Sequence, residues 1–383
     1  MCRTFFWIGL TSYGGPAIVA QIRKVTLLQQ KWLSEREFEE GLAFCQTLPG
    51  PIACQTAAHI GWRLHGGLGV FLALLFYDLP AFLLMLGLSW AYFRFGRLPV
   101  VEAVMRGLGA VVVAIVAESI LSMGKPALKD WRGLLIAAAA GAGLFFGWGA
   151  VPVLLAAALA GILLLWASPA QALPPPAAEA PRRGGWGKTF AWVLLGAALF
   201  TGLVLATGLL DPSLPPLAWA MVKVNLLAFG GGYTAVALMY SQVVTSHAWL
   251  TPKEFVDGLA LGQITPGPVI MTSTFIGYRL AGLAGAVVGT VCVFWPSALL
   301  LTLLAPQFER VRRIKAVASG VRGLLAAFIA MLFYVLWQVA GASLTGPVEL
   351  AITVVALALL RLKVSPAWVI LGTVILSAWA LRG

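Results

Sequence analysis

The sequence predicts an all-α polytopic membrane protein with two inverted-topology repeats that contain broken or re-entrant helices. Three observations lead to this fold class: a very apolar composition, long apolar stretches, and one module that occurs twice. Apolar residues make up 60% of the 383 residues and charged residues only 10%, whereas soluble domains carry roughly 25% charged residues. The apolar stretches also lack the polar alternation of a membrane β-barrel. We therefore expect a helical bundle in lipid.

The apolar stretches are long enough to form membrane helices, because about 20 helical residues cross a bilayer core of about 30 Å. We expect a helix at each of the stretches 69–93, 100–122, 133–147, 150–167, 189–210, 283–305, 316–340, 348–360 and 365–381.

The repeated module is centred on a Pro-Gly-Pro sequence. Pro49-Gly50-Pro51 recurs as Pro266-Gly267-Pro268, a spacing of 217 residues, and the flanking residues recur with it. Internal repeats of this kind are decisive for the architecture. The match divides the chain into a first transporter repeat (1–167), a linker with a connecting transmembrane helix (168–210) and a second transporter repeat (211–383).

Loop cations indicate that the two copies have opposite orientations, because cytoplasmic loops collect Lys and Arg. Loop 23–36 holds four cations, whereas its counterpart at roughly 240–254 holds only Lys253. Loop 310–315 reverses the bias, with four cations against Arg94 and Arg97 in the first copy. If both broken segments of a module dip in and return, each module crosses four times, and the connecting helix inverts the second copy.

The remaining charges and motifs exclude several function classes. The net charge of +12 comes from short clusters between apolar stretches, which suits loop orientation better than a contiguous nucleic-acid-binding patch. The histidines His59, His65 and His247 form no spaced set, and no hydrolase or Walker motif occurs. We therefore expect no enzymatic activity, metal site, cofactor or nucleic-acid partner.

The two Pro-Gly-Pro sequences predict interrupted helices. Proline removes a backbone donor and glycine permits a tight reversal, so 36–65 and 253–281 should each form two half-helices. Such breaks at matching positions of two repeats indicate a transporter's substrate site. The second half-helix begins at the break, so its free amides and positive dipole end would receive an anion. The alternative is a pair of packing kinks.

The expected substrate-binding residues surround these breaks and the upstream glycine clusters. Gln46 and Gln263 occupy matching positions and can donate hydrogen bonds to an oxyanion. Arg63 and Arg279 either join the site or sit at half-helix ends, near C-terminal dipoles or lipid headgroups. The full set is Gly14, Gly15, Gln46, Thr47, Pro49, Gly50, Pro51, Arg63, Asn225, Gly230, Gly231, Gln263, Thr265, Pro266, Gly267, Pro268 and Arg279.

Charges inside apolar stretches need a partner or a function, because each costs about 2.5–3.5 kcal/mol on insertion scales. Asp78 and Glu118 have uncharged counterparts in the second copy. They either carry a coupling proton or neutralise Arg63 or Arg106. Lys223 precedes the second glycine cluster and is a further coupling candidate.

Four motifs of the chain resemble those of the chromate ion transporter family in its two-module form. They are Ser12-Tyr13-Gly14-Gly15-Pro16, Gln46-Thr47-Leu48-Pro49-Gly50-Pro51, Ala228-Phe229-Gly230-Gly231-Gly232-Tyr233 and Gln263-Ile264-Thr265-Pro266-Gly267-Pro268. The resemblance covers almost the whole chain. It implies export of chromate from the bacterial cytoplasm across the inner membrane by a secondary transporter or antiporter, driven by the proton gradient or the membrane potential.

The residues themselves leave the anion open. A site of amides, Gln, Thr and Arg recognises shape and charge, and chromate and sulfate are tetrahedral dianions of similar size. The alternatives are an importer or exchanger of sulfate or another oxyanion, and a channel or membrane scaffold whose breaks are structural. The sequence also leaves a homodimer open.

Overall fold

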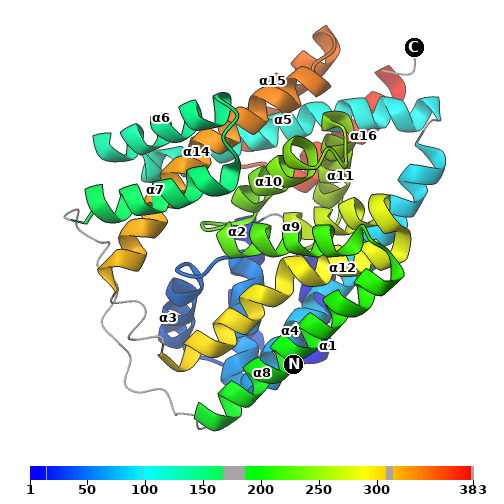
Figure 1. The fold of residues 1–383 in the computed structure, drawn as a ribbon. Helices are drawn as coiled ribbons and strands as arrows, with labels where there is room; N and C mark the ends of the chain where they lie inside the picture. Colours follow the sequence, from blue (N-terminus) through cyan, green and yellow to red (C-terminus); the bar gives the residue numbers. More distant parts are fainter. Residues whose placement is uncertain (14, 97, 167–185, 308–313, 381–383) are drawn as a thin grey trace.

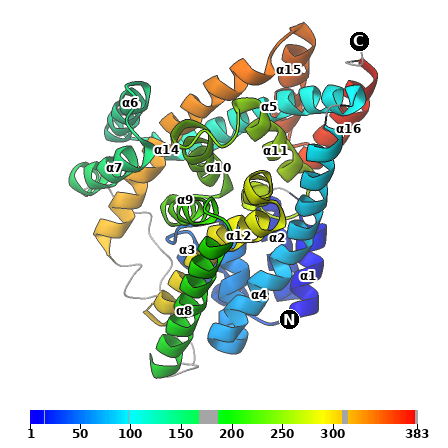
Figure 2. The ribbon, with the colours of Figure 1, turned by 45° about the vertical axis from the view of Figure 1, so that its right-hand side comes forward.

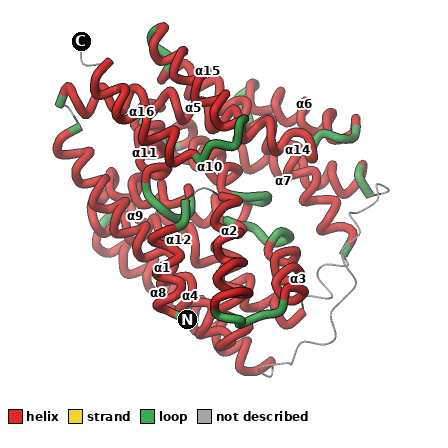
Figure 3. The backbone as a smooth tube through the Cα atoms, turned by 180° about the vertical axis from the view of Figure 1, so that it is seen from behind, coloured by secondary structure: helices red, strands yellow, loops and turns green. Residues whose placement is uncertain are grey.

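A computed structural model describes residues 1–13, 15–96, 98–166, 186–307 and 314–380. These residues form α-helices joined by short loops, with short 3-10 and π segments and no strand (Figures 1 and 3). Five helical segments are long and apolar enough to cross a membrane: Ile52–Phe95, Pro99–Ala127, Thr189–Leu209, Val269–Gln307 and Lys315–Ser343. The prediction of an all-helical, multi-pass membrane protein is confirmed.

The order of helices in the first half recurs in the second. The first half contains α1 (Cys2–Thr11), α2 (Gly15–Arg23), the π-helix η1 (Lys24–Gln29), α3 (Glu35–Cys45), α4 (Ile52–Phe95), α5 (Pro99–Ala127), α6 (Trp131–Phe145) and α7 (Ala150–Leu164). After α8 (Trp186–Leu210), the second half contains α9 (Leu214–Leu227), α10 (Gly232–Tyr240), the π-helix η2 (Ser241–Ser246), α11 (Pro252–Ile264), η3 (Val269–Met271), α12 (Thr272–Leu304), η4 (Ala305–Gln307), α14 (Lys315–Ser343), α15 (Pro347–Arg361) and α16 (Pro366–Ala380).

Rare backbone conformations recur at the same places in both halves. The π-helices η1 and η2 each follow the short helix after the glycine cluster. Lys31 (φ 52°) and Ala248 (φ 51°) are both left-handed although neither is glycine. Because such residues are uncommon, their recurrence at matching positions shows that the repeat extends from sequence into backbone geometry.

The longest helix, α4, is folded back on itself. Its backbone leaves helical geometry at His65 and Gly66. A Cβ on Gly61 would lie 2.1 Å from the carbonyl oxygen of Gly69, whereas eight residues of straight helix span about 12 Å. The helix therefore has two arms, 52–64 and 67–95, in close contact at glycines.

The helix α12 repeats this fold-back. Its backbone leaves helical geometry at Ala281 and Gly282, and a Cβ on Gly277 would lie 1.9 Å from the carbonyl oxygen of Gly285. Thr274 and Thr290 hydrogen-bond across its two arms, 272–280 and 283–304, at 2.7 Å.

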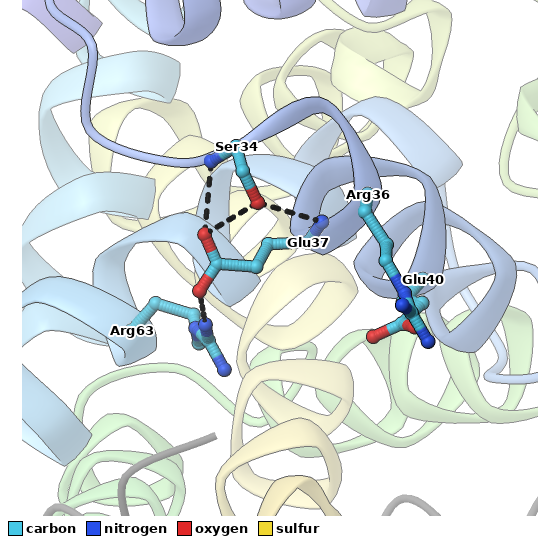
Figure 4. Close-up of polar contacts among 5 residues, drawn as sticks. All are labelled: Ser34, Arg36, Glu37, Glu40 and Arg63. Carbon is cyan, nitrogen blue, oxygen red and sulfur yellow. Dashed lines mark hydrogen bonds and ion pairs between the residues drawn. The ribbon is translucent and has the colours of Figure 1, made fainter. Parts of the chain in front are cut away.

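Each first arm forms a hairpin with the helix before it. The first hairpin (35–64) joins α3 to the first arm of α4, and the second hairpin (252–280) joins α11 to the first arm of α12. A Pro-Gly-Pro sequence forms each tip. The base of the first hairpin is closed by an ion pair between Arg63 and Glu37 (Figure 4), and that of the second by Arg279 and Glu254 at 3.3 Å.

The bases of the two hairpins lie at opposite ends of the second arm of α4. This arm starts beside Arg63, at the base of the first hairpin. Near its other end, Tyr92 donates a hydrogen bond to Asp257 of α11 at 2.7 Å, and the Phe93 ring stacks on Phe275 and Tyr278. In Figure 1, α3 correspondingly lies low on the left and α11 high on the right.

The other helices pack around this centre. The long helices α5 and α14 contact each other; α14 also packs against α6 and α7, and α5 against α15 and α16. The connecting helix α8 lies along α12 and α4 (Figure 2). Trp295 of α12 donates a hydrogen bond to the Gly196 carbonyl of α8 at 3.1 Å.

Candidate functional site

Each hairpin tip is hydrogen-bonded to the other half of the protein. The Gly50 amide donates to the Ala228 carbonyl at 2.7 Å, and the Gly267 amide donates to the Ser12 carbonyl at 2.8 Å. Ser12 and Ala228 are the C-caps of α1 and α9, directly before the two glycine clusters. The structure therefore brings each Pro-Gly-Pro sequence next to the broken segment of the opposite copy.

The tip geometry requires glycine between the prolines. Gly50 has φ 104° and Gly267 has φ 99°, in the left-handed region where side chains are strained. The flanking prolines lack amide donors and end the preceding helix. Both tips are buried.

The helices that start at the tips have no side-chain cap. Pro51 is the N-cap of α4 and Pro268 that of η3, and neither proline side chain can accept a hydrogen bond from the first amides of the helix. The outer helices of the hairpins do have capping boxes, formed by Ser34 with Glu37 and by Thr251 with Glu254. Uncapped amides at a helix N-terminus form a site for an anion.

Polar groups of the second half surround the first tip. Asn225 is fully buried, and its Nδ2 donates to the Val293 carbonyl at 2.7 Å and to Ser297 Oγ at 3.1 Å. A Cβ on Gly50 would lie 3.1 Å from Ser297 Oγ and 3.3 Å from Asn225 Nδ2. Asn225 Oδ1 has no hydrogen-bond partner among the described residues.

The second tip has apolar neighbours at the matching positions. Ala81 stands where Ser297 stands in the other copy, and a Cβ on Gly267 would lie 2.9 Å from its Cβ. Gly9 corresponds to Asn225 and packs directly against the Tyr77 carbonyl. The two tips are therefore alike in backbone and different in polarity.

The first tip contains a residue that the sequence analysis missed. Gln55 is buried, and its Nε2 donates to the Pro49 carbonyl at 2.7 Å. Its Oε1 has no partner in the described part of the chain. Ser297 was missed as well. Gln55 could have been found from its place in the first helical turn after the Pro-Gly-Pro break. Ser297 gave less indication, because it follows Pro296 in a stretch that is otherwise apolar.

The predicted glutamines and threonines lie in different environments. Gln46 is exposed at the end of α3, whereas Gln263 is half-buried and its Nε2 has no partner among the described residues. The Tyr233 side chain, which directly follows the second glycine cluster, neighbours Gln263. The Thr47 and Thr265 hydroxyls donate to carbonyls of their own helices.

The predicted arginines are not brought to the tips. Arg63 lies twelve residues after Pro51, about 18 Å along the helix, and is bound to Glu37 at the hairpin base. Burial acts to raise the pKa of Glu37, but hydrogen bonds from Ser34 and the charge of Arg63 outweigh it and hold that pKa below its ordinary value. Arg279 pairs with Glu254 and lies over the Phe93 ring.

The glycine clusters are partly described. Gly230 (φ 89°) and Gly231 (φ 127°) are both left-handed and precede α10. Gly15 begins α2, and Gly14 lies outside the described residues.

The three coupling candidates also differ. Asp78 is only 7% exposed and lines a cavity of about 250 Å³ between α4 and α12. Cys54 Sγ donates a hydrogen bond to Asp78 Oδ1 at 3.9 Å, and no cation among the described residues pairs with Asp78. Glu118 instead pairs with Arg361 at 3.7 Å. Lys223 is half-buried on α9.

Two further buried carboxylates were missed, one in each hairpin. Glu40 pairs with Arg36 at 3.3 Å, and Asp257 pairs with Lys253 at 3.7 Å. Both acids stand one helical turn after a cation at matching repeat positions, which is the signal that could have revealed them. In the part of the chain that the structure describes, no group of His, Cys, Asp and Glu residues could hold a metal ion.

Comparison with known proteins identifies relatives along most of the chain. The family profile described as "Chromate transporter" matches residues 1–162 and 216–378. The chromate transport protein of Cupriavidus metallidurans is 32% identical over 383 aligned residues, covering 97% of this chain and 90% of the relative. That of Pseudomonas aeruginosa is 33% identical, covering 84% and 78%. An uncharacterized transporter of Methanocaldococcus jannaschii is 31% identical, covering 86% and 81%. No solved structure matches.

Proposed function

Since the chain belongs to the chromate transporter family, we propose that it is a secondary transporter that exports chromate across the cytoplasmic membrane of a bacterium. The proton gradient or the membrane potential drives this export. Two relatives that cover most of the chain are named chromate transport proteins, which supports chromate as the substrate.

The observation that carries the proposed mechanism is the pair of reciprocal hydrogen bonds from Gly50 to Ala228 and from Gly267 to Ser12. They support a central site to which both halves contribute. The oxyanion takes the place of the missing helix caps after Pro51 and Pro268 and accepts hydrogen bonds from the free amides there.

Side chains at the first tip complete the proposed site. Asn225 and Ser297 come from the second half and Gln55 from the first. A movement of one half relative to the other therefore changes the positions of these side chains relative to one another. A site assembled at the contact of two repeats is the arrangement from which alternating access follows. At the second tip, the side chain of Gln263 is part of the proposed site.

We propose that the repeats are inverted, with the two hairpins re-entrant from opposite sides of the membrane. The loop cations support this arrangement, and so does the position of the hairpin bases at the two ends of the second arm of α4. Each module then crosses four times, with α8 as the connecting helix.

Asp78 is the proposed proton-coupling residue. It is buried, has no cationic partner among the described residues, and lines a cavity between helices of the two halves. A carboxylate in a membrane segment without a partner is a functional candidate. Glu118 pairs with Arg361, a cation other than the expected Arg63 and Arg106, and this ion pair supports a charge-neutralising role for Glu118.

The test is a transport assay with the purified protein in liposomes, in which chromate and sulfate compete as substrates. We expect saturable chromate flux that accumulates substrate against its gradient and is weakly inhibited by sulfate. Preferred transport of sulfate would favour the other-oxyanion alternative. Non-saturating flux that only dissipates a gradient would identify a channel.

A further inference from the structure

A polar cleft of about 790 Å³ lies between α1 and the segment formed by α2 and η1. Two cations, Arg3 and Lys24, lie on its wall, and amide and hydroxyl side chains accompany them: Thr4, Thr11, Gln21, Gln29 and Gln30. No carboxylate lines the cleft, and no acid among the described residues pairs with Arg3 or Lys24. Its lining therefore offers hydrogen-bond donors and positive charge without an internal counter-ion.

Hydrogen bonds through Ser12 connect the wall of the cleft to the second hairpin tip. Gln21 Nε2 donates to Thr11 Oγ1 at 2.7 Å, and the Ser12 hydroxyl donates to Gln21 Oε1 at 3.0 Å. The carbonyl of the same Ser12 accepts the Gly267 amide. The polar wall is thus continuous, through one residue, with the proposed anion site.

The matching region of the second half is closed. The side chains from Thr234 to Tyr240 in α10 are all buried, whereas several side chains of α2 are exposed. Leu238, which corresponds to Gln21, is fully buried and apolar. Trp219 stands in the place of Arg3. The cleft is therefore a property of one half, and the two repeats are packed differently around a shared centre.

We propose that this cleft is the vestibule through which the oxyanion reaches the second tip, and that Arg3 and Lys24 concentrate the anion there. The inference rests on the proposed function as an oxyanion transporter. A concave surface of one charge sign raises the local concentration of its counter-ion. Loop 23–36 is rich in cations and hence expected on the cytoplasmic side, which is the side from which an exporter takes up its substrate.

The phosphate of an anionic lipid shares this chemistry and is the competing occupant. Arg3 and Lys24 would bind a phosphate headgroup by the same charge and hydrogen bonds. An experiment that varies the lipid composition distinguishes the two sources, because the surface potential of anionic lipid acts on wild type and variants alike, whereas a lipid bound in the cleft acts only through Arg3 and Lys24.

Arg23 provides a matched control for Lys24. It is the preceding residue and carries the same charge, but it pairs with Glu35 and with Glu39 and does not line the cleft. Arg23→Gln therefore removes a loop cation without changing the charge of the vestibule.

The test is the initial rate of chromate transport from the cytoplasmic face in liposomes of neutral phosphatidylcholine. We expect Arg3→Gln and Lys24→Gln each to raise the KM for chromate about fivefold and to retain the maximal rate. Added salt should reduce the difference in KM between variant and wild type, because it screens the charges. Lys24→Arg and Arg23→Gln should keep the wild-type KM at equal protein abundance.

Each of three results would contradict part of this proposal. Unchanged KM in both cleft variants, or an equal rise in Arg23→Gln, would overturn the vestibule. A wild-type KM that rises when phosphatidylglycerol is added, while the variants do not respond, would assign the cleft to a lipid headgroup. Absence of chromate flux in the wild type would instead overturn the proposed function.

Discussion

Arg63 and Glu37 form an ion pair that joins the end of one helix of the first hairpin to the start of the other (Figure 4). Glu37 is also the carboxylate of the capping box with Ser34, so a single side chain caps α3 and closes the hairpin. The equivalent pair, Arg279 with Glu254, does the same in the second half. The two arginines at matching repeat positions thus act on the shape of the hairpins in this structure.

Arg63→Gln should destabilise the protein by about 1 kcal/mol at neutral pH, because the pair is partly exposed and screened by water. The pKa of Glu37 is lowered in the folded state, so this contribution is present above its ordinary pKa and is lost as pH falls through the folded value. Thermal unfolding in detergent should show a Tm gap between wild type and variant at pH 7 that closes in acid, as the pH falls through the lowered pKa of Glu37. A gap that persists in acid would contradict the assignment.

Gly50→Ala and Gly267→Ala should each reduce chromate transport strongly. An L-residue in the left-handed region costs about 1–2 kcal/mol, and at Gly50 the added methyl also meets Ser297 and Asn225. Gly87→Ala is the control, because a Cβ there meets open space. The measurement is flux normalised to membrane abundance, and wild-type flux in both tip variants would exclude the tips from the site.

Gln263→Ala should raise the KM for chromate about tenfold, since a lost hydrogen bond to a charged ligand is worth about 1.5 kcal/mol or more. Gln46→Ala should have a smaller effect, because Gln46 is exposed whereas Gln263 has a buried Nε2 without a described partner. Concentration-dependent transport measures both. The reverse order would place the anion nearer to α3 than to α11.

Asp78→Asn should abolish the pH dependence of chromate uptake into everted vesicles under an imposed pH gradient. Glu118→Gln is the matched control, since Glu118 already has Arg361 as a partner and should keep the pH response. If both variants respond to pH as the wild type does, the coupling proton is carried elsewhere, and Asp257 becomes the next candidate.

Leu28→Cys and Thr245→Cys should react with a membrane-impermeant thiol reagent from opposite sides of the membrane. Both side chains are exposed and lie in the π-helices η1 and η2. A Cys2→Ser background is suitable, because Cys45, Cys54 and Cys292 are buried. Labelling of both positions from the same side would rule out inverted repeats.

The sequence predicted the helices and the breaks because both are local properties. Continuous apolar stretches specified α5 and α14, and proline with glycine specified the ends of α3 and α11. The fold-backs at Gly66 and Gly282 lie where the expected half-helix pairs, 36–65 and 253–281, give way to the apolar stretches that begin at 69 and 283. The close packing of the two arms at Gly61 with Gly69 and at Gly277 with Gly285 was not predicted, because these contacts depend on the fold-back itself.

The partners of the site residues were harder to predict because they are distant in sequence. Nothing local to Asn225 indicates that it reaches Val293 and Ser297 of α12, and nothing local to Tyr92 indicates Asp257. These contacts follow from the way the two halves pack. The positions of Arg63 and Arg279 could not be predicted for the same reason. Each arginine lies at the hairpin base rather than in the anion site because it pairs with Glu37 or Glu254.

The reciprocal tip hydrogen bonds also constrain how such a protein can be divided. Neither half supplies the acceptor for its own glycine amide, so a polypeptide with a single copy of the module would have to borrow a carbonyl from a second chain. Antiparallel pairing of two such chains would satisfy both amides at once. The fused form makes this pairing permanent, and it lets the two tips diverge, as Asn225 and Gly9 have done.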